Sequence, residues 1–201
     1  MSDSDFKQYD FERPSTLFIL EDKLKNLLGG LFLYNRYFKK FAVKGNESVL
    51  DFGCGGGTGS RCLANLLDKG GHLTCIDVSH YWMARARKRL DKYSNVECKL
   101  GDIRELDIPD SSFDIISTFY VIHDITPAER HDIVRALSQK LKEGGVLFIK
   151  EPVKKPHGML PEEIRALLSD AGLKEIEHKE TKSEYTGKYQ KFNQVRHATL
   201  S

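Results

Sequence analysis

The sequence lacks a long apolar run, a marked excess of charge of one sign and a secretory signal. Its longest apolar stretches, such as Thr16–Leu20 and Val146–Ile149, are far shorter than the roughly 20 residues of a transmembrane helix. The 31 basic and 29 acidic side chains give a net charge of +2, too small to indicate nucleic-acid binding. Residues Met1–Asp5 contain neither the basic nor the apolar region of a signal peptide. We therefore expect a cytoplasmic protein with no transmembrane segment and no nucleic-acid partner.

Cysteine is scarce, and the cysteines do not fall at metal-binding spacings. Cys54, Cys62, Cys75 and Cys98 form no Cys-x-x-Cys pair, and no histidine stands beside them at zinc-ligand spacing. A metal site or a disulfide is the less common alternative. We predict buried free thiols in a reducing compartment, and no metal centre.

The length and composition predict one globular domain. Of the 201 residues, 40% are hydrophobic and 30% charged, which excludes a disordered or collagen-like chain. Residues 1–45 are a predicted N-terminal helical cap, and residues 46–201 the body of the same structural domain. In the cap, apolar residues recur at helical spacing from Glu21 to Phe41, with a break or kink at Gly29-Gly30. A basic amphipathic helix can lie on a membrane surface, but packing onto the protein's own body is commoner and is what we expect.

The body alternates between short apolar strands and amphipathic helices. Predicted strands are 49–52, 72–76, 96–100, 113–120 and 146–150, followed by an edge strand at 173–179 that can pair with 184–192 as a hairpin. Predicted helices are 57–67, 81–93, one from a Thr126 cap to a stop at Gly144-Gly145, and one from Pro161 to Gly172. Strands joined by helices pair in parallel, so the fold class is α/β with a doubly wound sheet. Such sheets bind ligands at the carboxyl ends of their strands.

A glycine-rich loop follows the first strand of the body. Residues 49–59 read Val-Leu-Asp-Phe-Gly-Cys-Gly-Gly-Gly-Thr-Gly, and such a loop lets the backbone approach a ligand closely. The dinucleotide pattern Gly-x-Gly-x-x-Gly/Ala fits poorly, because Thr58 or Ser60 stands where it requires glycine or alanine. The loop instead has an acid at the strand end, Asp51, followed by glycines at alternate positions. Alone, it is also compatible with a purely structural turn.

This pattern resembles motif I of the class I S-adenosylmethionine-dependent methyltransferases, and three later segments are similar to that family in the same order. They are 75–86, with an acid ending the second strand, 101–103, which reads Gly-Asp-Ile, and 106–114, a leucine–proline loop leading into Phe-Asp. The similarity continues more weakly to about residue 180. It is closest to the small-molecule branch that includes ubiquinone and menaquinone biosynthesis methyltransferases. The resemblance implies a mostly parallel, seven-stranded, Rossmann-like methyltransferase sheet, with S-adenosylmethionine as cofactor and S-adenosylhomocysteine as its product.

The resemblance also implies which residues bind the cofactor. Carboxylates at the strand ends suit a ligand that carries an ammonium, a sulfonium and ribose hydroxyls. After the third strand, Asp102 is similar to the family's adenine-binding acid, although a turn acid is its structural alternative. Trp82 replaces the family's usual methionine, and its alternative is a core residue. The implied cofactor-binding residues are Asp51, Gly53, Cys54, Gly55, Asp77, Val78, Trp82, Asp102, Ile103 and Phe119.

The end of the fourth strand, Thr118–Asp124, is expected beside the transferred methyl group. His123 is the side chain there that exchanges a proton near neutral pH, so it is the candidate catalytic residue. Its alternative is a structural role in anchoring the loop, because a base is needed only where the acceptor must lose a proton. By analogy with the family, Tyr9, Tyr120 and His157 are candidate acceptor-site or lid residues.

We predict an enzyme that transfers a methyl group to a small-molecule acceptor, planar or apolar in view of the aromatic residues of the cap. Two alternatives stay open: a non-catalytic S-adenosylmethionine-binding partner subunit, and an RNA or protein methyltransferase. A nicotinamide-dependent oxidoreductase shares the architecture, but the glycine spacing and the lack of a Tyr-x-x-x-Lys pair argue against it. No motif identifies the acceptor, the use of a base or the oligomeric state.

Overall fold

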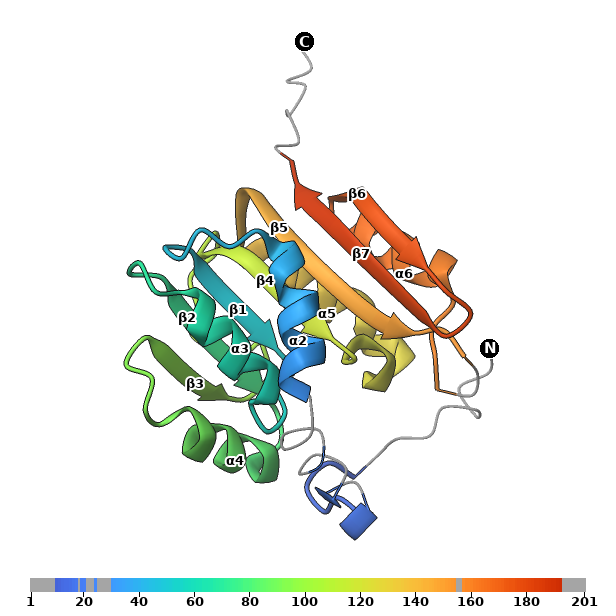
Figure 1. Ribbon diagram of the computed structural model, residues 1–201. Helices are drawn as coiled ribbons and strands as arrows, with labels where there is room; N and C mark the ends of the chain where they lie inside the picture. The colour runs from blue at the N-terminus through green and yellow to red at the C-terminus, as the bar shows by residue number, and fades with distance from the viewer. Residues whose placement is uncertain (1–9, 18, 21–23, 25–29, 155–156, 193–201) are drawn as a thin grey trace.

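A computed structural model describes residues 10–17, 19–20, 24, 30–154 and 157–192 (Figure 1). These residues form a seven-stranded sheet, in the order β3-β2-β1-β4-β5-β7-β6, with helices on both faces. The strands are β1 (Ser48–Phe52), β2 (His72–Asp77), β3 (Val96–Leu100), β4 (Phe113–Phe119), β5 (Leu141–Pro152), β6 (Leu173–Glu180) and β7 (Glu184–Lys191). The helices are α2 (Gly30–Phe38), α3 (Thr58–Leu66), α4 (His80–Leu90), α5 (Pro127–Lys140) and α6 (Pro161–Asp170), with short 3-10 helices η2 (Lys39–Phe41) and η3 (Ile122–Asp124).

The sheet is parallel from β3 to β5 and antiparallel at its other edge. β1 pairs in parallel with both β2 and β4, so the winding of the chain reverses direction between them. β7 pairs antiparallel with β5 and with β6, which leaves β6 at the edge. The predicted α/β class, the mostly parallel seven-stranded sheet and the terminal hairpin are therefore confirmed. The reversal between β1 and β4 is the point at which such sheets bind ligands.

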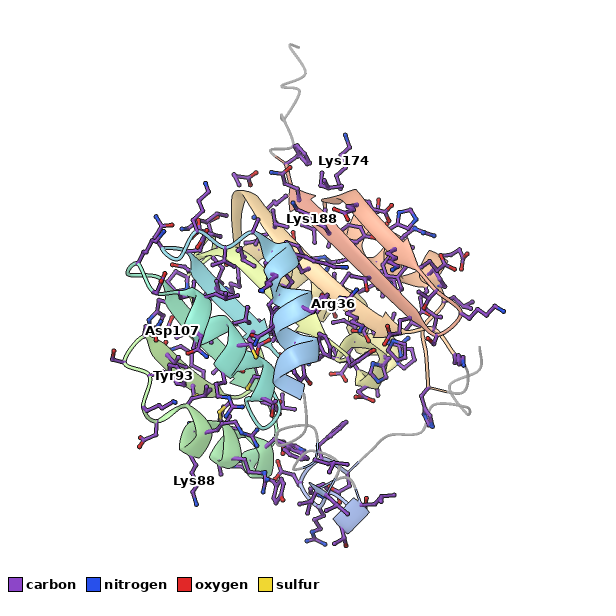
Figure 2. All side chains as sticks on the ribbon, viewed as in Figure 1. Arg36, Lys88, Tyr93, Asp107, Lys174 and Lys188 are labelled. Carbon is purple, nitrogen blue, oxygen red and sulfur yellow. The ribbon has the colours of Figure 1, made fainter. Side chains whose placement is uncertain are left out.

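Neighbouring residues of the central strands belong to cores on opposite faces of the sheet. In β4, Ile115 packs with residues of α2, α3 and α4, whereas Ile116 packs with residues of α5 and α6. The two layers of helices are visible on the two sides of the sheet (Figure 1). Charged side chains such as Lys88 of α4 and Lys174 of β6 are exposed and extend outward (Figure 2). Burial on both faces explains the nearly continuous apolar sequence of the central strands.

The described part of the N-terminal cap packs against the body. Tyr37, Phe38 and Phe41 are buried, and the ring of Phe41 stacks on Phe148 of β5 with centroids 3.7 Å apart. Packing onto the body is thus confirmed for this part of the cap. Most of the predicted helix before residue 30 lies outside the described residues. No helix in the described part of the chain is both long and apolar enough to cross a membrane.

Helix α5 begins where predicted and ends earlier. Thr126 is its N-cap and Pro127 its first residue, and the Thr126 hydroxyl donates to the Glu129 carboxylate. The predicted stop at Gly144-Gly145 is wrong, because the helix ends at Lys140 and β5 begins at the next residue. Leu141 falls within the predicted helix, but in the structure it pairs with Phe113 of β4 and is fully buried in the sheet. An apolar residue at this junction satisfies either pattern, so periodicity does not locate the boundary.

Candidate active site

A cavity of about 430 Å³ lies at the carboxyl ends of β1, β2 and β4, where the winding of the sheet reverses. This volume is typical of a site for a small molecule. Its walls are the glycine loop after β1, the segments that follow β2, β3 and β4, and the first turn of α5. Phe11, Tyr34 and Phe38 add a wall from the N-terminal part of the chain. The structure therefore brings the glycine loop and the later predicted segments together around one space.

The glycine loop turns sharply because three of its glycines, Gly53, Gly55 and Gly57, have positive φ. Gly53 has φ +69° and Gly55 has φ +51°. The N–H groups of Gly53 and Cys54 both donate to the carbonyl of Ile76, at 2.8 and 3.0 Å, which ties the loop to β2. A Cβ at Gly53 would lie 2.4 Å from Cγ2 of Val121, whereas a Cβ at Gly55 would meet no atom within 4 Å. Gly53 is thus required for packing, and Gly55 leaves the cavity open to a ligand.

Arg89 of α4 supports the glycine loop. Its guanidinium donates to the carbonyl of Gly56 and, at 2.8 Å, to the hydroxyl of Thr58 at the start of α3. Sequence reasoning did not single out Arg89, because it is one of several basic residues in the last turn of α4 and no motif distinguishes it. The contact fixes the loop where it meets the N-terminus of α3.

Asp51 lies near the end of β1, buried between β2 and β4. The Ser60 hydroxyl donates to its carboxylate at 2.6 Å. Burial raises the pKa of Asp51 to about 6, although the hydrogen bond from Ser60 acts in the opposite direction. A buried carboxylate is stabilised in its charged form by a nearby cation. This position therefore favours a positively charged group of a ligand.

Asp77 is the last residue of β2, and two backbone N–H groups fix its carboxylate. Gly55 donates to Oδ2 at 2.8 Å and Ser79 donates to Oδ1 at 2.9 Å. Burial raises the pKa of Asp77, while these hydrogen bonds oppose the shift. Each carboxylate oxygen retains a lone pair for a ligand hydroxyl. The next residue, Val78, also lines the cavity and is 62% exposed, so a ligand can cover it.

Trp82 and Ile103 form apolar wall on the side of β2 and β3. Trp82 is 5% exposed and Ile103 is 1% exposed, and both line the cavity. The backbone N–H of Trp82 donates to the hydroxyl of Ser79, the N-cap of α4, at 3.2 Å. Trp82 is therefore both a buried core residue and a residue of the cavity wall.

The N-terminal segment packs against the turn between β2 and α4. Ser79 donates its hydroxyl to the carbonyl of Phe11 at 3.0 Å, and the N–H of His80 donates to Glu12 at 2.7 Å. Phe11 thereby reaches the cavity wall. Tyr9, the candidate lid residue, lies outside the described residues.

Asp102 lines the cavity, but Arg104 already engages its carboxylate. Arg104 donates from Nε at 3.0 and 3.1 Å and from Nη2 at 2.5 Å to the Asp102 oxygens. Nη2 also donates to Glu129 of α5 at 2.8 Å. The hydrogen bond from Arg104 lowers the pKa of Asp102 and keeps the carboxylate ionised. A ligand amine at Asp102 must share it with this guanidinium, a partner that sequence reasoning missed.

Phe119 and Tyr120 form the aromatic end of β4. The Phe119 ring lies 4.9 Å from that of Tyr34, and both line the cavity. Tyr120 has φ +58°, a conformation that costs a residue other than glycine about 1–2 kcal/mol. Its N–H donates to the carbonyl of Lys150 at 2.8 Å, and its hydroxyl donates to Glu184. These two hydrogen bonds to β5 and β7 hold the turn in place.

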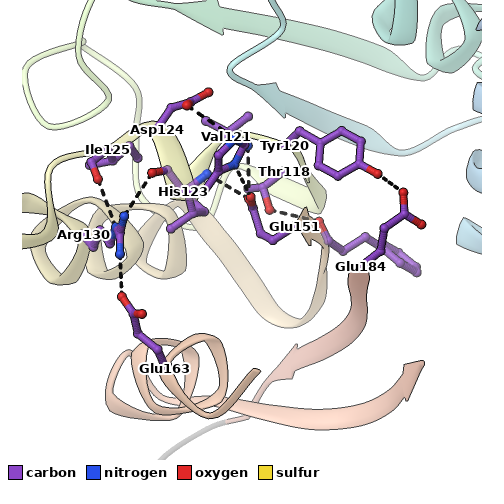
Figure 3. A network of polar contacts seen from close by, with 12 residues as sticks. Thr118, Tyr120, Val121, His123, Asp124, Ile125, Arg130, Glu151, Glu163 and Glu184 are labelled. Carbon is purple, nitrogen blue, oxygen red and sulfur yellow. Dashed lines mark hydrogen bonds and ion pairs between the residues drawn. The ribbon is translucent and has the colours of Figure 1, made fainter. Parts of the chain in front are cut away.

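His123 lies in η3 and contacts Glu151 (Figure 3). Its Nδ1 is 2.6 Å from Oε2 of Glu151, which is fully buried in β5 and also accepts N–H bonds from Val121 at 3.1 Å and Ile122 at 2.8 Å. Burial pulls the pKa of His123 down, but the hydrogen bond and charge of Glu151 outweigh it and the pKa is raised. His123 is not among the described residues that line the cavity, whereas its neighbour Asp124 is. His123 and Glu151 together anchor the segment after β4.

Asp124 carries a carboxylate into the cavity wall, next to His123. Oδ1 of Asp124 lies 3.4 Å from Nε2 of His123, and burial raises the pKa of Asp124. Arg130 of α5 braces the same segment by donating to the carbonyls of His123 and Ile125, both at 3.0 Å (Figure 3). The sequence showed Asp124 beside a histidine, but nothing in the pattern distinguished which of the two side chains faces the cavity.

The other predicted residues divide between the cavity and its surroundings. Cys54 is buried and lines the cavity, and all four cysteines are free. His157 is exposed and is not among the described lining residues, although its charge lowers the pKa of Asp124. His157 therefore influences the charge of the cavity wall through Asp124, although it does not itself line the cavity.

Comparison with known proteins identifies the family. Residues 49–145 match a family of proteins described as the methyltransferase domain. The ubiquinone/menaquinone biosynthesis C-methyltransferase of Pseudomonas savastanoi is 30% identical over 139 residues, which are 65% of this chain and 52% of that enzyme. Residues 49–145, a little under half of the chain, are therefore a methyltransferase domain, and the match supports a class I S-adenosylmethionine-dependent methyltransferase. The chain spans about half the length of that curated relative and less than two thirds of others that it matches.

Solved structures share the fold of this methyltransferase domain. An S-adenosylmethionine-dependent methyltransferase from Aquifex aeolicus superposes with a TM-score of 0.68 at 22% identity, covering 94% of this chain and 98% of the other. The [4+2]-cyclase SpnF superposes with a TM-score of 0.72 at 18% identity, covering 81% of each chain. At these identities the likeness concerns the fold alone. One of these neighbours is described as a cyclase, so the fold alone does not identify the reaction.

The cavity residues fit S-adenosylmethionine, the cofactor of this family. Acids stand near the ends of β1 and β2 and after β3, and Gly55, whose N–H donates to Asp77, leaves open space in the same cavity. Asp51, Asp77 and Asp102 line this cavity together with Trp82 and Ile103, which contribute apolar surface. Carboxylates beside apolar surface are compatible with a ligand that carries positive charge, hydroxyls and an aromatic base.

Proposed function

We propose that this protein binds S-adenosylmethionine in the cavity and transfers its methyl group to a small-molecule acceptor that is apolar or planar. The observation that carries the proposal is the convergence of Asp51, Asp77 and Asp102 on one cavity beside the open backbone of Gly55. Three carboxylates at the ends of successive strands suit the ammonium, hydroxyl and amine groups of this cofactor. The proposed cofactor-binding residues are Asp51, Gly53, Cys54, Gly55, Asp77, Val78, Trp82, Asp102, Ile103 and Phe119.

When bound, S-adenosylmethionine would supply a methyl group on a sulfonium sulfur, which would retain the electron pair of the carbon–sulfur bond on transfer of that methyl group. The protein's own work is to hold the reacting atoms about 3 Å apart and to exclude water. Phe11, Tyr34 and Phe119 form apolar wall suited to the second task. Asp51 and Asp77 orient the ligand through fixed carboxylates.

Three features support a small-molecule acceptor. The cavity of about 430 Å³ is of the size that encloses small ligands. Much of its wall is aromatic or aliphatic, which favours an apolar or planar body. The net charge of +2 provides no general attraction for nucleic acid. The proposal includes a cytoplasmic location, which the four free thiols support.

Calorimetric titration with S-adenosylmethionine, S-adenosylhomocysteine and NADH tests the proposal. We expect the first two to bind with micromolar affinity, about −8 kcal/mol, and NADH not to bind. Asp77→Ala should weaken both by about tenfold or more, because hydrogen bonds to a charged group are lost. Asp107→Ala, at an exposed acid outside the cavity, is the matched control and should leave both affinities unchanged. Binding of NADH without binding of either sulfur nucleoside would refute the proposal.

A further inference from the structure

We infer that the acceptor is an organic amine, and that Asp124 is the residue that binds its ammonium group. The inference rests on the proposed function and names the substrate class of the same cavity. It assigns Asp124 as the acceptor-binding carboxylate, while His123 and Glu151 are positioning residues that act through it.

The charge of the cavity wall favours a cationic acceptor. Five of the described lining side chains are acids and one is a cation: Asp51, Asp77, Asp102, Asp124 and Glu129 against Arg104. Arg104 is shared between Asp102 and Glu129, so it leaves the other three acids uncompensated by any cation of the described wall. S-adenosylmethionine carries two positive groups and one negative group, and its net charge of +1 does not offset this excess. A cleft with charge of one sign and apolar walls concentrates ligands of the opposite sign.

Asp124 lines the cavity and lies outside the proposed cofactor-binding set. Behind it stand His123, whose Nε2 lies 3.4 Å from Oδ1, and the fully buried Glu151, whose Oε2 lies 2.6 Å from Nδ1 of His123. Even when protonated, His123 carries one positive charge against the two carboxylates that it contacts, so Asp124, His123 and Glu151 together retain at least one negative charge. Arg130 also acts on Asp124, but its guanidinium pairs with Glu163 at 2.5 Å. His157 acts from the surface.

The walls of the cavity that Asp124 lines also suit an ammonium attached to an apolar body. Tyr34, Phe119 and Tyr120 line the cavity, and aromatic faces attract cations. Phe119 and Tyr120 already show this behaviour, because Nζ of Lys150 lies 5.2 Å from each ring centroid. Lys150 is not among the described lining residues and is paired with Glu184 at 3.2 Å. Ile125 and Ile133 supply aliphatic wall beside the acid.

Asp124 suits an amine for a second reason. A protonated amine has no free electron pair, so it must lose one proton before its nitrogen can attack. Asp124 can accept that proton, leaving a neutral carboxylic acid and an amine with its lone pair available. Burial raises the pKa of Asp124, which makes the carboxylate a better proton acceptor than an exposed one.

Binding of three probes of similar shape tests the inference without any need to know the natural acceptor. The protein saturated with S-adenosylhomocysteine is titrated with 2-phenylethylamine, 2-phenylethanol and 3-phenylpropionate, with the fluorescence of Trp82 or calorimetry as the readout. We expect the amine to bind about tenfold or more tightly than the alcohol, and the carboxylate to bind least. Asp124→Asn, which preserves shape, should remove the preference for the amine. Asp132→Asn, at an exposed acid on the same helix as Glu129 but outside the cavity, should retain it.

The pH dependence of amine binding separates positioning from simple structural support. The charge of His123 lowers the pKa of Asp124. In His123→Asn, the pKa of Asp124 should therefore be higher, and the loss of amine binding on acidification should shift to higher pH. A purely structural histidine would change the affinity without moving this profile, and that result would overturn the role of His123.

The outcomes distinguish this inference from the proposed function. Failure of S-adenosylhomocysteine to bind would overturn the proposed function itself. If it binds, equal or tighter binding of the alcohol or the carboxylate would overturn the amine assignment. The same holds if no probe binds, or if the preference survives in Asp124→Asn.

Discussion

Substitution of Gly53 by alanine should destabilise the protein through a clash with Val121. The new Cβ would lie 2.4 Å from Cγ2 and 2.6 Å from Cγ1 of Val121, far inside normal contact distance. Val121 cannot rotate away freely, because its side chain is β-branched and its N–H is held by Glu151 at 3.1 Å. Overpacking of this kind costs about 1–3 kcal/mol. The left-handed backbone, with φ +69°, adds about 1–2 kcal/mol.

The expected loss for Gly53→Ala is therefore about 3 kcal/mol in the free energy of unfolding. For a chain of this size that corresponds to a fall of about 10 °C in the melting temperature. Chemical denaturation followed by circular dichroism measures the first quantity, and differential scanning calorimetry the second. Gly55→Ala is the matched control: its φ is +51°, but its Cβ meets no atom within 4 Å, so it should lose only about 1 kcal/mol.

Gly55→Ala, the less destabilised of the two variants, should be the one with the larger loss of cofactor affinity. The Cβ of Gly55→Ala enters the space where the ligand is proposed to lie, so S-adenosylhomocysteine should bind more weakly although the fold is nearly intact. Adding Val121→Ala to Gly53→Ala should recover the clash contribution, which a double-mutant cycle measures. Equal destabilisation by the two alanines, or no recovery in the double variant, would refute the reasoning from the Gly53–Val121 contact.

Two further predictions concern titration. The pKa of Asp51 is raised by burial from 3.8 to about 6, so its ionisation destabilises the fold as pH rises through this window; Asp51→Asn should gain about 3 kcal/mol at pH 8 and nothing near pH 3. Denaturation at both pH values checks this, and an equal gain at both would contradict it. The pKa of His123 is raised, so its stabilising contribution is complete below its unfolded value and lost as pH rises through the folded one. The stability difference between the protein and His123→Asn should therefore shrink with rising pH, and a constant difference in denaturation experiments would disprove the ion pair with Glu151.

The positions of the residues proposed to bind the cofactor were predictable because local sequence determines them. A glycine loop between a strand and a helix, with Asp51 before it, fixes a turn at the carboxyl end of β1 whatever the rest of the chain does. Asp77 ends the next strand, so parallel pairing brings it to the same edge. Their hydrogen-bond partners, Ser60 and the N–H of Gly55, lie within the same two strand–helix units.

The segment after β4, where we propose that the acceptor binds, was less predictable because its contacts join distant parts of the chain. Glu151 lies 28 residues from His123 in sequence, yet their side chains are 2.6 Å apart. Glu184 and Tyr120 are separated by 64 residues. No spacing rule connects such positions, and the register of β5 against β4 and β7 is what brings them together. The same long-range packing decided whether His123 or Asp124 faces the cavity.

The two ends of the cavity are nevertheless one packed unit. Gly53 belongs to the loop after β1 and Val121 to the segment after β4, and they approach so closely that no Cβ fits between them. The N–H of Val121 is in turn held by Glu151, which also holds His123 beside Asp124. A shift of the glycine loop on ligand binding must therefore move Val121 or be resisted by it. Glu151 is fully buried and hydrogen-bonded on both oxygens, so moving Val121 away from it would cost more free energy than leaving the loop in place. The loop should therefore be preorganised, with the ligand adapting to it.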